Sequence, residues 1–202
     1  MVRIAAFLTM AVILSTPAAA QNLLTNPFFV GSTSGWDTSP HAVWDGALNF
    51  NDSPDGDDGV LRISTSESDA AWQCVAIAPG QRYVFGAAVI NDPSAEAQPC
   101  AASAWQVDIE WWNGTECQQP LSAMIDDTRI GPDDRTNVLW LEEKQTFTAP
   151  AGATRARVVL ASSCASRSGA TSTLFDDVLF EADEIAKFDF EIHASEGGPG
   201  SS

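Results

Sequence analysis

Short segments of strand character, separated by turn residues, run along most of this chain, and little in it repeats at helical spacing. Stretches such as residues 52–59 (DSPDGDDG) and 149–153 supply the glycine, proline and aspartate that turns need. Many short strands of this kind predict an all-β fold, an antiparallel sandwich of two sheets. The expected strands cover residues 23–29, 42–50, 60–65, 71–77, 83–90, 104–112, 138–148, 155–161 and 174–181, with a long irregular stretch over 113–137.

The chain is expected to divide into three parts. Residues 1–20 carry one early charge, Arg3, then an apolar run and three alanines. This pattern predicts a secretory signal peptide, too short to span and stop in a membrane. Residues 21–182 have a suitable length for one domain with its own core. Residues 183–202 end in EGGPGSS and are predicted to form a flexible acidic tail. We therefore expect a secreted or periplasmic protein.

The charge balance narrows the possible partners. The chain has 10 Lys and Arg against 27 Asp and Glu, a formal net charge of −17. Such a surface repels phosphate backbones, so nucleic acid is not expected as a partner, and no later segment suggests membrane insertion. Only two histidines occur, and the sequence has no G-x-S-x-G, P-loop or dinucleotide fingerprint.

Four cysteines in an exported chain predict two disulfides, and a strand arrangement suggests their pairing. If 83–90 and 104–112 run antiparallel, Cys117 returns to the start of the former. If 155–161 also lies beside 83–90, Cys164 reaches the same rim, and the remaining two cysteines share the opposite rim. The expected pairs are Cys74–Cys100 and Cys117–Cys164.

Residues 104–112 (AWQVDIEWW) alternate between apolar and polar side chains. One set is expected to pack between the sheets, and the other to face outward. An aromatic ring that stacks on a sugar, flanked by carboxylates and amides for its hydroxyls, is the physical form of a sugar site. The buried set is Trp105, Val107, Ile109 and Trp111. The candidate ligand-binding set is Trp112, Gln106, Asp108 and Glu110.

Arg157 is expected to join this outward face. Its neighbours Ala156 and Val158 belong to an apolar set, so Arg157 projects to the other side and could pair with Asp108 or Glu110. A polar strand face is most often only a solvated surface, and that reading stays open. The tryptophans Trp36, Trp44 and Trp72 are expected in the core or at its rim.

Asp108 and Glu110 also allow a catalytic reading. Residues two apart on one strand face have Cα atoms about 6.5–7 Å apart, near the separation of paired glycosidase carboxylates. Any such acidic pair has this spacing, and two neighbours on one strand seldom flank a substrate bond. We therefore predict no catalytic residue and no enzyme.

Three segments of the chain carry a family resemblance. They are 22–36 (NLLTNPFFVGSTSGW), 72–89 (WQCVAIAPGQRYVFGAAV) and 146–180, which contains TFTAPAGATRARVVL and ends in LFDDVLF. In this order they resemble the first strand, the central hairpin and the last strands of carbohydrate-binding modules of the galactose-binding, jelly-roll type. The resemblance implies a jelly-roll sandwich that binds sugars without transforming them.

The same resemblance implies a possible structural calcium, although no cofactor is expected to be required. Asp176 matches the aspartate of the last strand in the family and is expected to point inward. The usual glutamate of the first strand is Val30 here, and the usual glycine is Pro27, so one hard oxygen ligand is lost. A second acidic cluster, residues 51–59, lacks the EF-hand spacing and is interpreted as a flexible turn.

Taken together, the sequence predicts a secreted, non-catalytic protein that holds a polysaccharide or glycan on a concave strand face by aromatic stacking and hydrogen bonds. One alternative is a structural or adhesive extracellular domain that binds protein or matrix, because a fold does not fix a function. The less favoured alternative is a glycoside hydrolase or lyase that uses Asp108 and Glu110.

Overall fold

The computed structural model describes residues 21–48, 50, 59–65, 68–91, 103–119, 122–133, 141–164 and 171–183. In these ranges the chain forms ten strands and no helix, so nothing there could cross a membrane as an apolar helix. The predicted signal peptide, residues 184–202 of the predicted tail, residues 51–58 and Trp140 lie outside the described residues. The strands are β1 (Asp37–Thr38), β2 (Ala42–Asp45), β3 (Val60–Thr65), β4 (Ser68–Ala76), β5 (Arg82–Asn91), β6 (Ser103–Gly114), β7 (Ser122–Asp133), β8 (Leu141–Thr148), β9 (Arg155–Cys164) and β10 (Thr171–Ala182).

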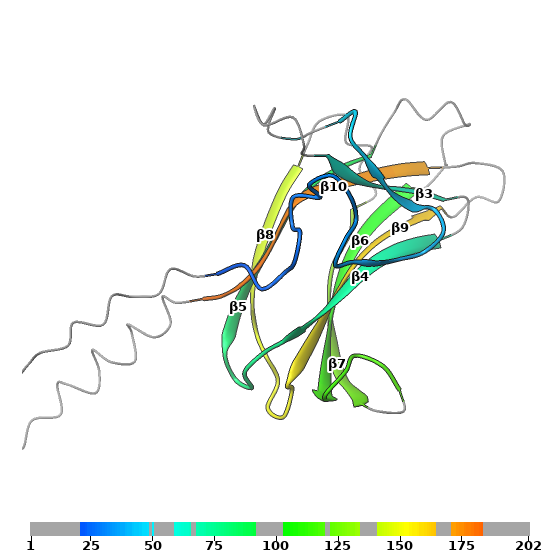
Figure 1. Ribbon diagram of the computed structural model, residues 1–202. Coiled ribbons are helices and arrows are strands. Elements are labelled where there is room, and N and C mark those ends of the chain that lie inside the picture. The colour runs from blue at the N-terminus through cyan, green and yellow to red at the C-terminus, as the bar shows by residue number, and fades with distance from the viewer. Residues whose placement is uncertain are drawn as a thin grey trace, which may run out of the picture.

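The strands form two five-stranded sheets, which confirms the predicted sandwich. The first sheet has the order β1-β4-β9-β6-β7, and the second has the order β2-β3-β10-β5-β8. Every pair of neighbours is antiparallel. Figure 1 shows the two layers, with β5, β8 and β10 in one and β4, β9 and β6 in the other.

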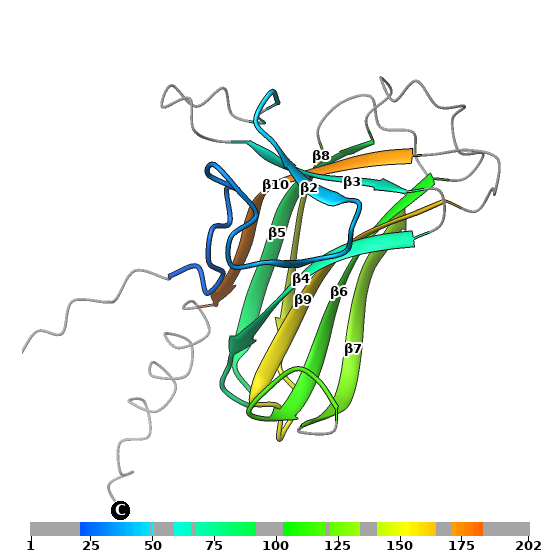
Figure 2. The same cartoon turned by 45° about the vertical axis from the view of Figure 1, so that its right-hand side comes forward.

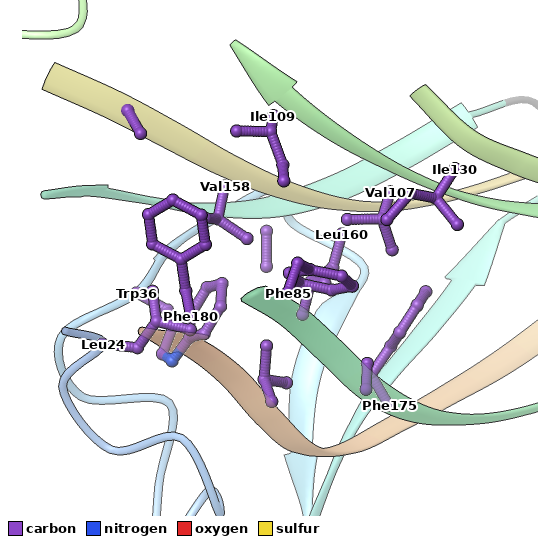
Figure 3. Close-up of a cluster of buried hydrophobic side chains, with 14 of the residues drawn as sticks. Leu24, Trp36, Phe85, Val107, Ile109, Ile130, Val158, Leu160, Phe175 and Phe180 are labelled. Carbon is purple, nitrogen blue, oxygen red and sulfur yellow. The ribbon is translucent and has the colours of Figure 1, made fainter. Parts of the chain in front are cut away.

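The core lies between the sheets and follows the predicted alternation. Along β6 the side chains of Trp105, Val107, Ile109 and Trp111 are all buried. The second sheet faces them with Phe85, Phe175 and Phe180, which Figure 3 shows packed opposite Val158 and Leu160 of β9. Fully burying a side chain of this size contributes about 1.5–3 kcal/mol, so this layer is the main stabilising element of the fold.

The first segment of the domain is not the strand that was predicted for residues 23–29. The backbone turns there, and Asn26 and Phe29 both have φ of 49°. Instead of a sheet ladder, the Asn22 side chain bonds the backbone of β10, donating to the Val178 carbonyl at 2.8 Å. The segment therefore closes one end of the sandwich and contributes buried side chains, among them Phe29, to the core.

The stretch 113–137, expected to be irregular, contains strand β7. It pairs with β6 alone and forms an edge of the first sheet. An edge strand has one unpaired side, so it tolerates the charged residues, glycine and proline that obscured its pattern. At the edge of the second sheet the predicted strand 42–50 is shorter, since β2 ends at Asp45.

The disulfide pairing that was predicted is wrong. Cys74 is joined to Cys117, with Cα atoms 5.9 Å apart. The prediction placed the strands 83–90, 104–112 and 155–161 side by side, whereas β5 lies in one sheet and β6 and β9 in the other. Because β9 lies between β4 and β6, the chain that leaves β6 returns across β9 to β4. Cys100 lies outside the described residues.

Candidate functional site

The outer face of the first sheet carries the side chains that were predicted to bind a ligand. On β6 these residues alternate with the buried set and point away from the second sheet. β9 lies directly beside them, with Arg157 opposite Glu110 and Arg155 opposite Trp112 in the antiparallel register. The structure thus brings together Trp112, Gln106, Asp108, Glu110 and Arg157 on one face, as the sequence predicted.

A tight contact joins three of these residues. Arg157 donates from Nε and Nη2 to the Glu110 carboxylate at 2.5 and 2.8 Å, and the Trp112 indole N–H donates to the same carboxylate at 3.1 Å. The guanidinium carbon lies 5.3 Å from the Trp112 ring centroid, within cation–π range. Trp112 is only 5% exposed. The open stacking platform that the sequence predicted at Trp112 is therefore covered by Arg157.

Asp108 also forms an ion pair, with Arg129 of the edge strand β7. The Arg129 guanidinium of β7 donates to one of its oxygens at 2.8 Å, and the Gln106 amide donates to the other at 2.5 Å. The hydrogen bond to Asp108 and the negative charge of this carboxylate raise the pKa of Arg129 above the ordinary arginine value. Both carboxylates of the suspected catalytic pair are thus held by arginines, which does not suit a proton-transferring pair.

A hollow of about 430 Å³ opens on the same face, between β4, β9 and the segment 115–118 that follows β6. Its volume lies within the range of small-molecule sites. Figure 2 shows the segment that follows β6 as a green arch at the end of this strand. The lining residues are Asp37, Trp72, Cys74, Thr115, Glu116, Cys117, Gln118, Arg155 and Arg157.

The wall formed by the segment 115–118 is firmly attached. The Cys74–Cys117 disulfide fixes it to β4, and Arg157 donates to the Cys117 carbonyl at 3.4 Å. At the start of the segment, the Thr154 hydroxyl bonds both the N–H and the carbonyl of Gly114, at 3.0 and 2.7 Å. The hollow therefore has a preformed wall that requires little ordering when a ligand binds.

Sequence reasoning did not assign Trp72, Arg155 and Asp37 to the site. Trp72 was expected in the core or at its rim, but it is half-buried and lines the hollow. The signal was present in β4, where Ala71, Gln73 and Val75 are buried and the residues between them face outward.

Asp176 lies where the resemblance placed a calcium ligand, and it points inward with 3% exposure. One carboxylate oxygen accepts the Phe50 N–H at 3.1 Å, and the other accepts the Asp177 N–H at 2.8 Å. Among the described residues no group of three or more His, Cys, Asp or Glu is placed to hold a metal ion. The structural calcium stays a prediction.

No protein-family model and no curated protein matches the sequence. Solved structures, however, share the fold. A family 16 carbohydrate-binding module matches with a TM-score of 0.55 at 16% identity, over 79% of this chain and 99% of its own. The xylan-binding domain CBM22-1 of Paenibacillus barcinonensis Xyn10C matches with a TM-score of 0.50 at 12% identity, over 83% of this chain and 97% of its own.

An enzyme also appears among the similar structures. The enzymatically active domain of bacteriophage CBA120 tailspike protein 4 matches with a TM-score of 0.53 at 14% identity, over 80% of this chain but 21% of its own. Identities this low establish the fold alone. The chain has the jelly-roll sandwich of carbohydrate-binding modules, as the resemblance implied.

Proposed function

We propose that the chain is a secreted, non-catalytic carbohydrate-binding protein that holds a glycan in the hollow on the outer face of the first sheet. The observation that carries this proposal is the hollow itself, with Trp72 in its lining and a disulfide-attached wall. It lies on a fold shared with carbohydrate-binding modules. One of these modules binds xylan, which makes xylan a first candidate ligand.

The chemistry of the lining suits a sugar. Trp72 offers an aromatic surface for the C–H face of a sugar ring. The polar groups of Asp37, Thr115, Gln118 and Arg155 supply both acceptors and donors for hydroxyl groups. Arg157 borders the hollow as well, and the ligand contacts predicted for Trp112, Gln106, Asp108 and Glu110 stay a prediction that variants can test.

A non-catalytic role is supported by the pairing of the acids. Asp108 and Glu110 neighbour each other on one strand, and each is bound by an arginine, Arg129 or Arg157. A glycoside hydrolase needs one acid to give a proton and the other to act as a base or nucleophile. Because each carboxylate is bound by an arginine and both lie on one strand, neither is placed to act as the acid, base or nucleophile of such a reaction.

One observation favours the alternative of an adhesive domain. Large apolar side chains are exposed in and beside β2, where they could meet a protein or matrix surface. A null result on a glycan array, together with self-association measured by light scattering, would support this alternative over sugar binding. The exposed residues in this region are Phe28, Val30, Val43, Trp44 and Leu48.

Affinity gel electrophoresis on polysaccharides tests the proposed function. We expect at least one polysaccharide, with xylan tried first, to retard the protein, and we expect Trp72→Ala to abolish the retardation. Trp44→Ala is the matched control, because Trp44 is exposed on the other sheet. If no polysaccharide retards the protein, or if the two variants behave alike, the proposal is wrong.

A further inference from the structure

Cationic side chains are few in this protein, and all but one of the arginines that the structure describes form an ion pair with a carboxylate. Arg62 pairs with Asp45, Arg82 with Asp183, Arg129 with Asp108 and Arg157 with Glu110. Arg155 is the exception, since it bonds no carboxylate within the part of the chain that the structure describes. This unpaired guanidinium lines the hollow.

Four charged side chains line the hollow, of which Arg157 bonds Glu110 and Glu116 accepts a hydrogen bond from Gln118. The other two, Arg155 and Asp37, lie apart from each other. Arg155 lies opposite Ala76 of β4, whereas Asp37 of β1 lies opposite Trp72. Four residues of strand separate these two positions, a span of about 13 Å. Asp37 is therefore far enough from Arg155 to leave the guanidinium available, and close enough to Trp72 to accept hydroxyl hydrogen bonds beside the ring.

We propose that the hollow selects acidic saccharides, with a uronate carboxylate on the Arg155 guanidinium and a sugar ring on Trp72. The inference rests on the proposed function and specifies its substrate class. The planar guanidinium matches a planar carboxylate in shape, because it can donate two parallel hydrogen bonds to the two carboxylate oxygens. Arg157 cannot serve in the same way, since Glu110 already occupies its fork.

A neutral sugar satisfies Arg155 less well. A ligand that fills the hollow excludes water from the guanidinium, and an unpaired charge that loses water is destabilised. A uronate supplies the missing partner. The net charge of −17 opposes an anionic ligand at long range, but salt screens that repulsion beyond about 8 Å at physiological ionic strength. The contact with Arg155 is shorter than this distance.

Calorimetric titration with matched oligosaccharides tests the inference. The probes are short uronate oligosaccharides from polygalacturonate, alginate and glucuronoxylan, each compared with its carboxyl-reduced, neutral counterpart. We expect at least one acidic probe to bind about tenfold or more tightly than its neutral counterpart, and high salt to reduce this ratio. Equal or tighter binding of the neutral counterparts would overturn the inference and leave sugar binding in place.

Variants test whether Arg155 causes the preference for acidic over neutral oligosaccharides. Arg155→Gln is expected to bring the affinity for the acidic probe down to that for its neutral counterpart. Lys144→Gln removes the same charge from an exposed position in the other sheet and is expected to change neither affinity. An unchanged preference in Arg155→Gln would overturn the inference. The absence of binding to any neutral or acidic glycan would overturn the proposed function as well.

Discussion

Two tryptophans on the same sheet face have opposite surroundings, and their neighbours explain the difference. Trp112 lies beside β9, whose Arg157 crosses its ring and bonds Glu110. Trp72 lies opposite Val159, whose short side chain cannot cover an indole ring. A strand pattern places both rings outward, but only the register between strands shows which ring a long side chain covers.

The covered ring is expected to matter for stability. Replacing a buried tryptophan by alanine removes its packing and leaves a cavity, so Trp112→Ala should lower the free energy of unfolding by about 3–5 kcal/mol. Urea denaturation, followed by the fluorescence of the other tryptophans, measures the change. Trp44→Ala, at a position 39% exposed, is the control and should cost much less. A cost below that of the control would show that Trp112 is not buried.

The Glu110 carboxylate, which accepts the hydrogen bond from the Trp112 indole N–H, is expected to be structural. Glu110→Gln keeps the size of the side chain but removes the charge that Arg157 and the Trp112 N–H share. Hydrogen bonds to charged groups contribute about 1.5–3 kcal/mol, so the variant should unfold at lower denaturant by a free energy of that order. Glu116→Gln makes the same substitution at an exposed position on the same wall and should change stability little. If Glu110 were catalytic, Glu110→Gln would instead abolish turnover of a polysaccharide at unchanged stability.

At the level of strands, the sequence predicted the interior better than the edges. The central strands β3, β5, β6, β9 and β10 all lie where periodicity and residue type placed them. In β6 and β9 burial on one face enforces alternation, whereas β5 and β10 contain continuous runs of buried residues. Edge strands lack this constraint on their unpaired side. Hence β7 was interpreted as a loop, and β1 was not predicted.

The order of strands in the sheets could not be obtained from local pattern. Periodicity shows which side chains share a face, but it does not show which strands are neighbours. The predicted pairing placed residues 83–90 beside 104–112, whereas β10 and β8 flank β5, and β9 and β7 flank β6. The wrong disulfide pairs followed from that error. The hollow that Cys74 and Cys117 help to line was not predicted for the same reason.

Peptide mapping of the oxidised protein tests the pairing directly. Digestion without reductant should yield a peptide that joins Cys74 to Cys117. Because four cysteines are present in the chain, the remaining two, Cys100 and Cys164, are expected in a second linked peptide. A peptide that links Cys74 to Cys100 would instead restore the pairing predicted from the sequence.

The disulfide should also stabilise the domain. It closes a loop with a sequence separation of 43, for which the chain-entropy relation gives about 4 kcal/mol. The double variant Cys74→Ser/Cys117→Ser should therefore unfold at clearly lower denaturant. It should also bind glycans more weakly, since the 115–118 wall loses its covalent attachment. Unchanged affinity in a folded double variant would show that this wall takes no part in binding.

At the scale of the whole molecule, added salt is expected to change stability and the affinity for an acidic ligand in opposite directions. With a net charge of −17, the acidic side chains repel one another in the folded state, and few ion pairs among the described residues offset this repulsion. Screening is therefore expected to raise the melting temperature as sodium chloride increases toward about 0.5 M. Differential scanning calorimetry measures this shift.

The same titration should weaken the binding of an acidic oligosaccharide, because its carboxylate contact with Arg155 is screened while contacts on Trp72 are not. Stability and affinity would thus move in opposite directions over one range of salt. A neutral carboxyl-reduced ligand should show only the stability change. If affinity for the acidic ligand instead rises together with the melting temperature, the relief of long-range repulsion outweighs the loss at Arg155, and the prediction that this contact dominates the salt dependence is wrong.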